Sequence, residues 1–162
     1  MKIGVISDTH IPDKAKEIPR EIFDEFMKVD MVIHAGDLVE MGVLNQLKEV
    51  CGDVRAVSGN MDPDSVRTHL PDKLIFKAGN YKIAVMHGTG SPEGLVRLLT
   101  DTFRNDSPDI IIFGHSHNAF NEKIKGVLFF NPGSATDKIF VEFNSYGIIE
   151  INGKIEARII KL

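Results

Sequence analysis

The feature that most restricts the fold is a regular alternation of short apolar runs and amphipathic helical stripes across residues 1–113. The runs are rich in β-branched side chains, which is typical of buried strands. Between them, apolar residues recur at the three- and four-residue spacing that places them on one face of a helix. The expected strands are 2–7, 31–34, 54–57, 73–77, 81–86 and 110–113, and the expected helices carry Ile18, Ile22, Phe23, Phe26 and Met27, then Met41, Leu44, Leu47 and Val50, then Leu95, Leu98, Leu99 and Phe103.

The part of the chain from Phe120 onward contains only strand-like segments. Asn152-Gly153 between the last two is the pair that two-residue hairpin turns favour. Strand–helix–strand units followed by an antiparallel tail predict an α/β sandwich with two sheets. Because there is no internal repeat or linker, residues 1–162 are expected to form a single domain. The expected strands in this part are 120–124, 127–130, 139–143, 146–151 and 154–160.

Composition narrows the partners and the compartment. The formal net charge is −4 and the basic residues are scattered, so a long nucleic acid is a disfavoured partner. The single cysteine, Cys51, cannot form an internal disulfide and is expected to be a packed, inert thiol. No apolar run is long enough for a signal peptide or a membrane span, which favours a cytoplasmic protein without a membrane partner.

Five of the expected strands are followed directly by side chains that can bind a metal ion. If the early strands are parallel, their carboxyl ends meet at one edge of the fold, which is where ligands bind in α/β sheets. Glycines stand beside these side chains, where the chain must turn sharply off a strand. The five segments are Asp8-Thr9-His10, Gly36-Asp37, Gly59-Asn60, His87-Gly88 and Gly114-His115-Ser116-His117.

These residue types suit one chemistry. Carboxylate, imidazole and amide oxygen together favour divalent ions such as Mn²⁺, Fe²⁺, Ni²⁺ or Zn²⁺. Seven candidate ligands exceed the three that a catalytic zinc takes, but they are enough for two ions if one carboxylate bridges. Two ions about 3.5–4 Å apart can bind a phosphate and lower the pKa of a bridging water towards roughly 7. The candidates are Asp8, His10, Asp37, Asn60, His87, His115 and His117.

The five segments, in this order, resemble the motifs of the calcineurin-like metallophosphoesterases, and Asn131-Pro132-Gly133-Ser134 resembles the compact prokaryotic phosphodiesterase branch. The resemblance implies a four-layer sandwich of two mixed β-sheets flanked by helices. It also implies a metal-dependent phosphodiesterase that acts on a small phosphodiester with two divalent ions, manganese being favoured over nickel, iron or zinc.

By motif position, Asp8, His10 and His117 would hold the first ion, Asn60, His87 and His115 the second, and Asp37 both. Asp37, Asn60, His87 and His115 would also be the catalytic residues.

One position departs from the family pattern. Many members have a histidine directly after the motif asparagine, where it contacts the phosphate and assists the leaving group. This chain has Met61 there, and a thioether cannot donate a proton. Asp62, which would orient that histidine, is expected to form local hydrogen bonds instead.

Three alternatives to a phosphodiesterase stay open. The first is a non-catalytic scaffold, as is thought for the retromer subunit of this fold, and the others are a phosphomonoesterase and a nuclease. A scaffold can lose metal residues freely, whereas all seven positions hold competent groups here, which favours an enzyme. Nucleases of the family carry capping domains for which this chain has no room. The sequence is compatible with a homo-oligomer.

Other candidate residues receive structural interpretations. His34 lies inside the second expected strand and is interpreted as a packed imidazole that supports the site, and His69 is expected to be solvated. Ser134 has no motif-paired base and follows an Asn-Pro-Gly turn, so it is not expected to be a nucleophile.

Overall fold

The computed structural model describes residues 1–162 and contains ten strands and four α-helices. The strands are β1 (Lys2–Ile6), β2 (Met31–His34), β3 (Val54–Ala56), β4 (Lys73–Ala78), β5 (Tyr81–Met86), β6 (Ile110–Ile112), β7 (Phe120–Ile124), β8 (Val127–Asn131), β9 (Ser145–Ile151) and β10 (Ile155–Lys161). The helices are α1 (Arg20–Phe26), α2 (Gly42–Val50), α3 (Asp64–Arg67) and α4 (Leu95–Thr102), the last preceded by a 3₁₀ turn over Pro92–Gly94.

The strands form two mixed sheets of five strands each. The first has the order β10-β9-β1-β2-β3, in which β1, β2, β3 and β10 run in one direction and β9 runs against them. The second has the order β4-β5-β6-β8-β7, in which β5, β6 and β8 are parallel. Two hairpins, β4–β5 and β7–β8, give the second sheet its antiparallel edges. The carboxyl ends of the parallel strands in each sheet therefore lie at the same edge of that sheet.

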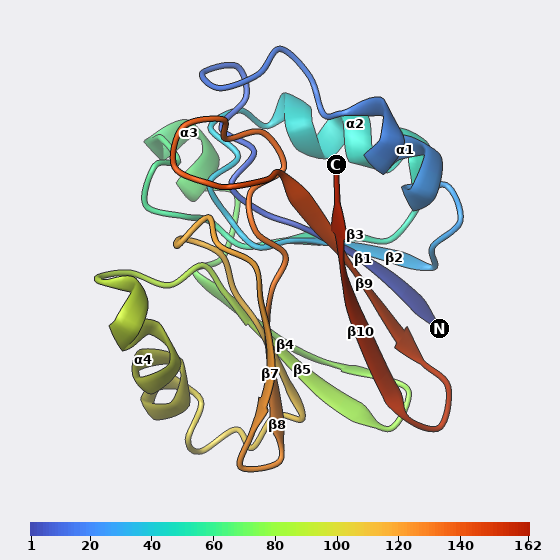
Figure 1. The fold of residues 1–162 in the computed structure, drawn as a ribbon, viewed down its shortest axis with the longest axis vertical. Coiled ribbons are helices and arrows are strands. Elements are labelled where there is room, and N and C mark those ends of the chain that lie inside the picture. The colour runs from blue at the N-terminus through green and yellow to red at the C-terminus, as the bar shows by residue number, and fades with distance from the viewer.

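The two sheets pack face to face between helices, which gives four layers (Figure 1). Helices α1 and α2 cover the outer face of the first sheet, and α4 covers the outer face of the second. Three separate apolar clusters fill the three interfaces between the layers. The predicted fold, an α/β sandwich of two mixed sheets flanked by helices, is therefore confirmed.

Strand β1 shows how the sequence specifies these layers. Ile3 and Val5 point into the cluster between the sheets, whereas Ile6 points to the helical side, as expected for side chains that alternate across a strand. Gly4 lies on the helical side beneath the ring of Phe26. A Cβ atom there would approach a ring carbon of Phe26 to 2.5 Å, so helix α1 can pack this closely only over glycine.

The prediction of a strand at residues 139–143 is wrong, because this segment is an irregular loop between β8 and β9. The N–H groups of Ile139 and Phe140 donate to the Asp137 carboxylate, at 2.9 and 3.4 Å, and this turns the backbone away from an extended path. Both side chains remain in solvent, 72% and 71% exposed. The composition of the segment suited a strand, but no neighbouring strand pairs with it.

Helix α3 is a second difference, since its four residues are too few to show a helical period in the sequence. The other expected strands and helices are present with small shifts at their ends. Cys51 is buried at the end of α2, as expected. None of the helices is both long and apolar enough to cross a membrane.

Candidate metal centre

All seven candidate ligands lie where parallel strands of the two sheets end. Asp8 and His10 follow β1, Asp37 follows β2, and Asn60 follows β3 in the first sheet. In the second sheet, His87 follows β5, and His115 and His117 follow β6. The chain therefore brings these side chains from both sheets to one place between the layers.

Four of the candidates form a compact first group. Asp8, His10, Asp37 and His117 each offer one ligand atom, and these atoms lie within 4.8 Å of one another. The Nε2 atoms of His10 and His117 are 3.1 Å apart, and His117 Nε2 is 3.4 Å from Asp8 Oδ1. Two donors at about 2.1 Å from one ion stand about 3.0–3.4 Å apart, so these separations suit ligands of a single ion.

The other three candidates form a second group beside the first. His115 Nδ1 lies 2.8 Å from Asn60 Oδ1, and the rings of His87 and His115 stand edge to face with centroids 5.4 Å apart. Asp37 lies between the two groups, because its Oδ2 is 3.7 Å from His10 Nε2 and 3.2 Å from His87 Nε2. That position suits a carboxylate that serves both groups.

Three imidazoles are held by their outer nitrogens. His87 Nδ1 donates to the Ala35 carbonyl at 2.8 Å, His115 Nε2 to the Gly90 carbonyl at 2.8 Å, and His117 Nδ1 to the Asp137 carboxylate at 2.5 Å. A carbonyl oxygen can only accept, so the proton of His87 and of His115 sits on the outer nitrogen. The inner nitrogens thus turn lone pairs toward the carboxylates and Asn60, and His87 Nε2 has no hydrogen-bond donor.

This arrangement of lone pairs suits a cation. Facing acceptors such as His115 Nδ1 and Asn60 Oδ1 repel unless both bind the same cation. Outer N–H groups fixed on carbonyl or carboxylate oxygens are the usual support of metal-binding histidines. The residues therefore fit divalent ions, and imidazole with oxygen donors suits borderline transition metals.

The titration of the buried carboxylates and of His87 agrees with a site built for positive charge. Burial raises the pKa of Asp8. Burial also opposes charge on His87, but its hydrogen bond with Asp37 and the negative charges of Asp8 and Asp37 raise its pKa to about 9. Without a bound ion, His87 is therefore expected to carry a second proton on Nε2, 3.2 Å from Asp37 Oδ2, and its Nε2 lone pair becomes available when a cation replaces that proton.

The backbone at the site is strained. Five of the seven candidates are non-glycine residues with a positive φ: Asp8, His10, Asp37, His115 and His117, at 52°, 41°, 58°, 71° and 58°. Each such conformation costs of order 1–3 kcal/mol and persists only where the surroundings fix it, which is common at functional sites.

Two glycines permit the closest approaches. A Cβ atom on Gly59 would stand 2.2 Å from Asp37 Oδ1, and one on Gly114 would stand 2.0 Å from Ser7 Oγ. Both positions lie directly before a candidate ligand in the sequence.

The loop that follows β3 fixes Asp37. The Met61 N–H donates to Asp37 Oδ1 at 2.7 Å, while the Met61 side chain points into solvent. The Asp62 carboxylate accepts the N–H groups of Asp37, Val39 and Gly59 at 3.1, 2.7 and 2.7 Å, so it joins the loops after β2 and β3. The prediction that Asp62 forms local hydrogen bonds is confirmed, and three donors already occupy this carboxylate.

Asp137 is a supporting residue that the sequence analysis missed. Its side chain is fully buried and binds His117 Nδ1, the Ile139 N–H and, at 4.0 Å, Lys14 Nζ. No motif identifies it, because the segment after Ser134 was expected to continue into a strand. In the sequence, Asp137 could have been suggested only by looking for a carboxylate that might reach the His-x-His pair.

We expect Asp137→Asn to weaken the binding of one divalent ion about 10- to 100-fold, since losing a partner of a metal-binding histidine typically has that effect. Titration with Mn²⁺ against a competing chelator would measure this. Asp13→Asn is the matched control, because Asp13 is an exposed carboxylate of the same pocket without a histidine partner. Equal Mn²⁺ affinity in Asp137→Asn and wild type would show that Asp137 does not support the site.

His34 supports the centre from within β2. Its Nδ1 accepts the Gly36 N–H at 3.2 Å, so its proton lies on Nε2, which donates to Thr9 Oγ1 at 3.1 Å. The imidazole is therefore neutral and fully paired, as the sequence suggested. Burial, and then the nearby charge of His87, lower the pKa of His34 to about 3.

This shift predicts a loss of stability in acid. The unfolded chain protonates His34 near pH 6.5, whereas the folded chain does not until about pH 3, so stability falls as the pH drops through this window. Relative to His34→Asn, wild type should lose about 2 kcal/mol of unfolding free energy between pH 7 and pH 5. Urea unfolding of both proteins in chelator measures it, and parallel pH profiles would contradict it.

Ser134 and His69 lie outside the two groups. Ser134 is buried, and its hydroxyl donates to the Asp8 carbonyl at 2.8 Å and accepts the Asp137 N–H at 3.0 Å. That network fixes the loops of Asp8 and Asp137. His69 is exposed at the end of α3, as predicted.

Two open pockets flank the centre. The Lys14 pocket, of about 310 Å³, is lined by His10, Lys14, Asn60, Met61, His115 and Phe140, among others. The Arg67 pocket, of about 250 Å³, is lined by Ser58, Asn60, Arg67, Asp72, His87 and Thr89, among others. Asn60 borders both pockets, so the centre opens to solvent on two sides.

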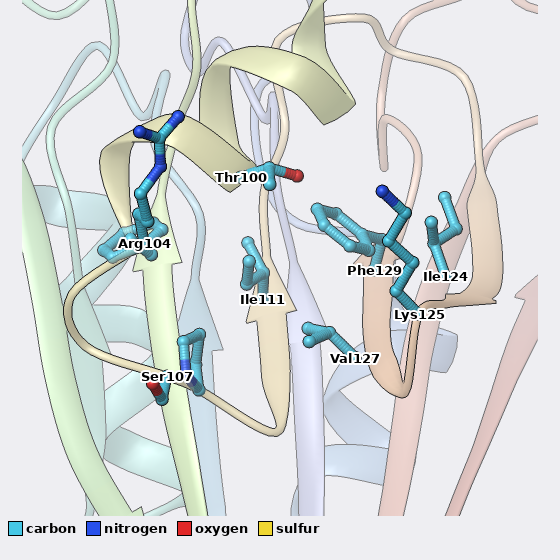
Figure 2. Close-up of a pocket in the computed structure, with 10 residues that line it drawn as sticks. Thr100, Arg104, Ser107, Ile111, Ile124, Lys125, Val127 and Phe129 are labelled. Atoms are coloured by element: carbon cyan, nitrogen blue, oxygen red, sulfur yellow. The ribbon is translucent and has the colours of Figure 1, made fainter.

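A further cavity, of about 230 Å³, lies away from the centre between α4 and the outer face of the second sheet (Figure 2). Ile111, Val127 and Phe129 form its apolar floor, and no carboxylate, imidazole or thiol lines it. It therefore lacks the side chains that usually bind a metal ion.

Comparison with known proteins agrees with this geometry. The model of the calcineurin-like phosphoesterase superfamily domain matches residues 1–154. A probable metallophosphoesterase from Methanothermobacter thermautotrophicus is 37% identical, over 99% of this chain and 92% of its own length. A phosphodiesterase from Methanocaldococcus jannaschii is 29% identical, over 82% of this chain and 83% of its own.

A solved structure has the same fold. Wild-type Vps29 from Entamoeba histolytica, complexed with Zn²⁺, aligns with a TM-score of 0.80 and 28% identity over 99% of both chains. The matched domain covers nearly the whole chain and includes every candidate ligand. The chain therefore belongs to the calcineurin-like phosphoesterase superfamily.

Proposed function

We propose that this protein is a phosphodiesterase that uses two divalent metal ions. The observation that supports it most is the arrangement of His87, His115 and His117, whose outer nitrogens are fixed while their inner nitrogens face shared oxygens. A purely structural cluster would pair those inner nitrogens with donors instead.

In this proposal Asp8, His10 and His117 hold one ion, Asn60, His87 and His115 hold the other, and Asp37 contacts both. Bound ions would supply positive charge for the phosphoryl oxygens and lower the pKa of the attacking water. The chain itself fixes the donors: the Met61 N–H orients Asp37, and the His115 N–H, 3.2 Å from both oxygens of Asp8, orients that carboxylate. Because these metal-binding side chains are already held in position, little free energy is lost to their reorganisation during the reaction.

The two flanking pockets favour a diester over a monoester. A diester carries two organic groups on one phosphorus, and the Lys14 and Arg67 pockets both border the centre and share Asn60. Each pocket can accept one group while the phosphoryl oxygens face the metal ligands. We further propose small diesters in the cytoplasm as substrates, because the net charge of −4 and the scattered basic residues do not suit a polynucleotide.

A scaffold role is the second candidate, and similarity to Vps29 favours it. Metal binding alone does not separate the two, since the neighbouring Vps29 structure is itself a Zn²⁺ complex. Hydrolysis does separate them, because a scaffold has no need for an accessible centre or for turnover.

The test is an assay of Mn²⁺-loaded protein on bis-p-nitrophenyl phosphate, p-nitrophenyl phosphate and a DNA oligonucleotide. We expect the diester to be hydrolysed fastest and chelation to abolish activity. Mn²⁺ or Ni²⁺ should restore it better than Mg²⁺, which prefers oxygen-rich, hydrated sites. No turnover of any ester by protein with both ions bound would favour the scaffold.

A further inference from the structure

The Lys14 pocket has an unusual rim for a polar site. Met61 and Phe140 stand at its mouth with 58% and 71% of their surfaces exposed, although most of the other lining groups are polar or charged. Large apolar side chains left in solvent beside a polar centre are typical of surfaces that contact a ligand. Phe140 comes from the irregular loop between β8 and β9, and Met61 from the loop after β3.

Lys14 occupies the same pocket and is held in place. Its Nζ lies 5.1 Å from the centroid of the Phe140 ring and 4.0 Å from Asp137 Oδ1. Asp137 also binds His117, so the ammonium group stands between the aromatic rim and the first ligand group. Because Phe140 remains 71% exposed beside the Lys14 ammonium group, another planar group can still stack on its ring.

The Arg67 pocket has a different character. Only one of its nine lining residues is hydrophobic, and its cation, Arg67, has no aromatic neighbour in the lining. The two sides of the centre therefore differ: one offers an aromatic ring with an ammonium group, and the other offers hydroxyl, amide and guanidinium groups. This asymmetry suits a diester whose two organic groups differ.

We propose that Phe140 and Lys14 form a subsite for a planar aromatic ester group of the substrate, which stacks on Phe140 while Lys14 attracts the phosphoryl charge. This inference rests on the proposed function, because it places the phosphoryl group at the candidate metal centre. Phe140 makes the site prefer an aromatic organic group, and Lys14 raises the affinity for any phosphoryl anion.

Binding of unreactive analogues tests the subsite without turnover. Phenylphosphonate and methylphosphonate share the anionic head and differ only in the aromatic ring. Calorimetry on Mn²⁺-loaded protein should show that Phe140→Ala weakens phenylphosphonate about three- to tenfold, the range expected for one aromatic contact, and leaves methylphosphonate unchanged. Ile139→Ala is the matched control, since Ile139 is equally exposed on the same loop but does not line the pocket.

Lys14→Gln should weaken both phosphonates about two- to fivefold, as expected for a partly exposed ion pair. Lys16→Gln, which removes an exposed charge two residues away, should change neither. Metal content is measured in every variant, so that a loss of ligand affinity is compared only at equal occupancy.

The following outcomes decide the question. Equal phenylphosphonate affinity in wild type and Phe140→Ala would overturn the subsite. An equal loss of affinity in Ile139→Ala and Phe140→Ala would also overturn it, as would a change in oligomeric state in both of these variants. Diester hydrolysis without Phe140-dependent selectivity would overturn the subsite alone. Phe140-dependent phenylphosphonate binding in a protein that hydrolyses no ester would support the subsite and overturn the proposed function.

Discussion

Asp37→Asn is expected to lower the rate of diester hydrolysis at least about a hundredfold, the upper end of what changes around metal ligands cost. Asp37 lies between the two ligand groups, with Oδ2 at 3.7 Å from His10 Nε2 and 3.2 Å from His87 Nε2. Asparagine keeps the shape of the side chain but removes the negative charge that would hold both ions. One of the two ions should therefore also bind more weakly.

The measurement is kcat/KM on bis-p-nitrophenyl phosphate together with the metal content of the variant. Asp24→Asn is the matched control, because Asp24 is an exposed carboxylate on α1 that lines neither pocket. It should stay within a few-fold of wild type. Near-normal activity in Asp37→Asn would show that this carboxylate does not serve both groups.

The second large effect concerns the leaving group, which the family pattern would place beside Met61. A positioned acid is typically worth about a hundred- to ten-thousand-fold, and the thioether of Met61 cannot provide one. The enzyme should therefore hydrolyse nitrophenyl diesters, whose leaving group departs as a stable anion, and act on alkyl diesters slower by a factor in that range.

Met61→His should raise the rate on alkyl diesters more than on nitrophenyl diesters. We expect a gain of about tenfold, below the usual range for a positioned acid, because the Asp62 carboxylate already accepts three backbone N–H groups and cannot freely orient the new imidazole. Met61→Leu, which stays apolar, should change neither rate. Equal gains on both ester classes would mean that position 61 does not lie beside the leaving group. Fast hydrolysis of alkyl diesters by wild type would mean that another group, such as the Lys14 ammonium, supplies the proton.

Much of the fold could be predicted because its strands are short, buried and apolar. Residues such as Ile110–Ile112 are buried in a parallel sheet on both faces, which requires a continuous apolar run that is easy to recognise. The candidate ligands were predictable for the same reason, since each follows one of these runs directly.

The interactions that depend on distant loops were not predictable. Asp137 turns the backbone of residues 139–140 and also binds His117, and neither contact leaves a periodic pattern in the sequence. The same carboxylate thus explains both the missing strand at 139–143 and the missed supporting residue. The joining of two loops by Asp62 was likewise visible only in three dimensions, although its polar role was expected.

The central claim is that one chain holds two ions between its sheets. Elemental analysis of the protein after saturation with Mn²⁺ and removal of free metal tests this most directly. We expect a value that approaches two ions per chain, with Asp137→Asn and Asp37→Asn each falling below it at limiting Mn²⁺. A firm value of one ion per chain at saturation would contradict it.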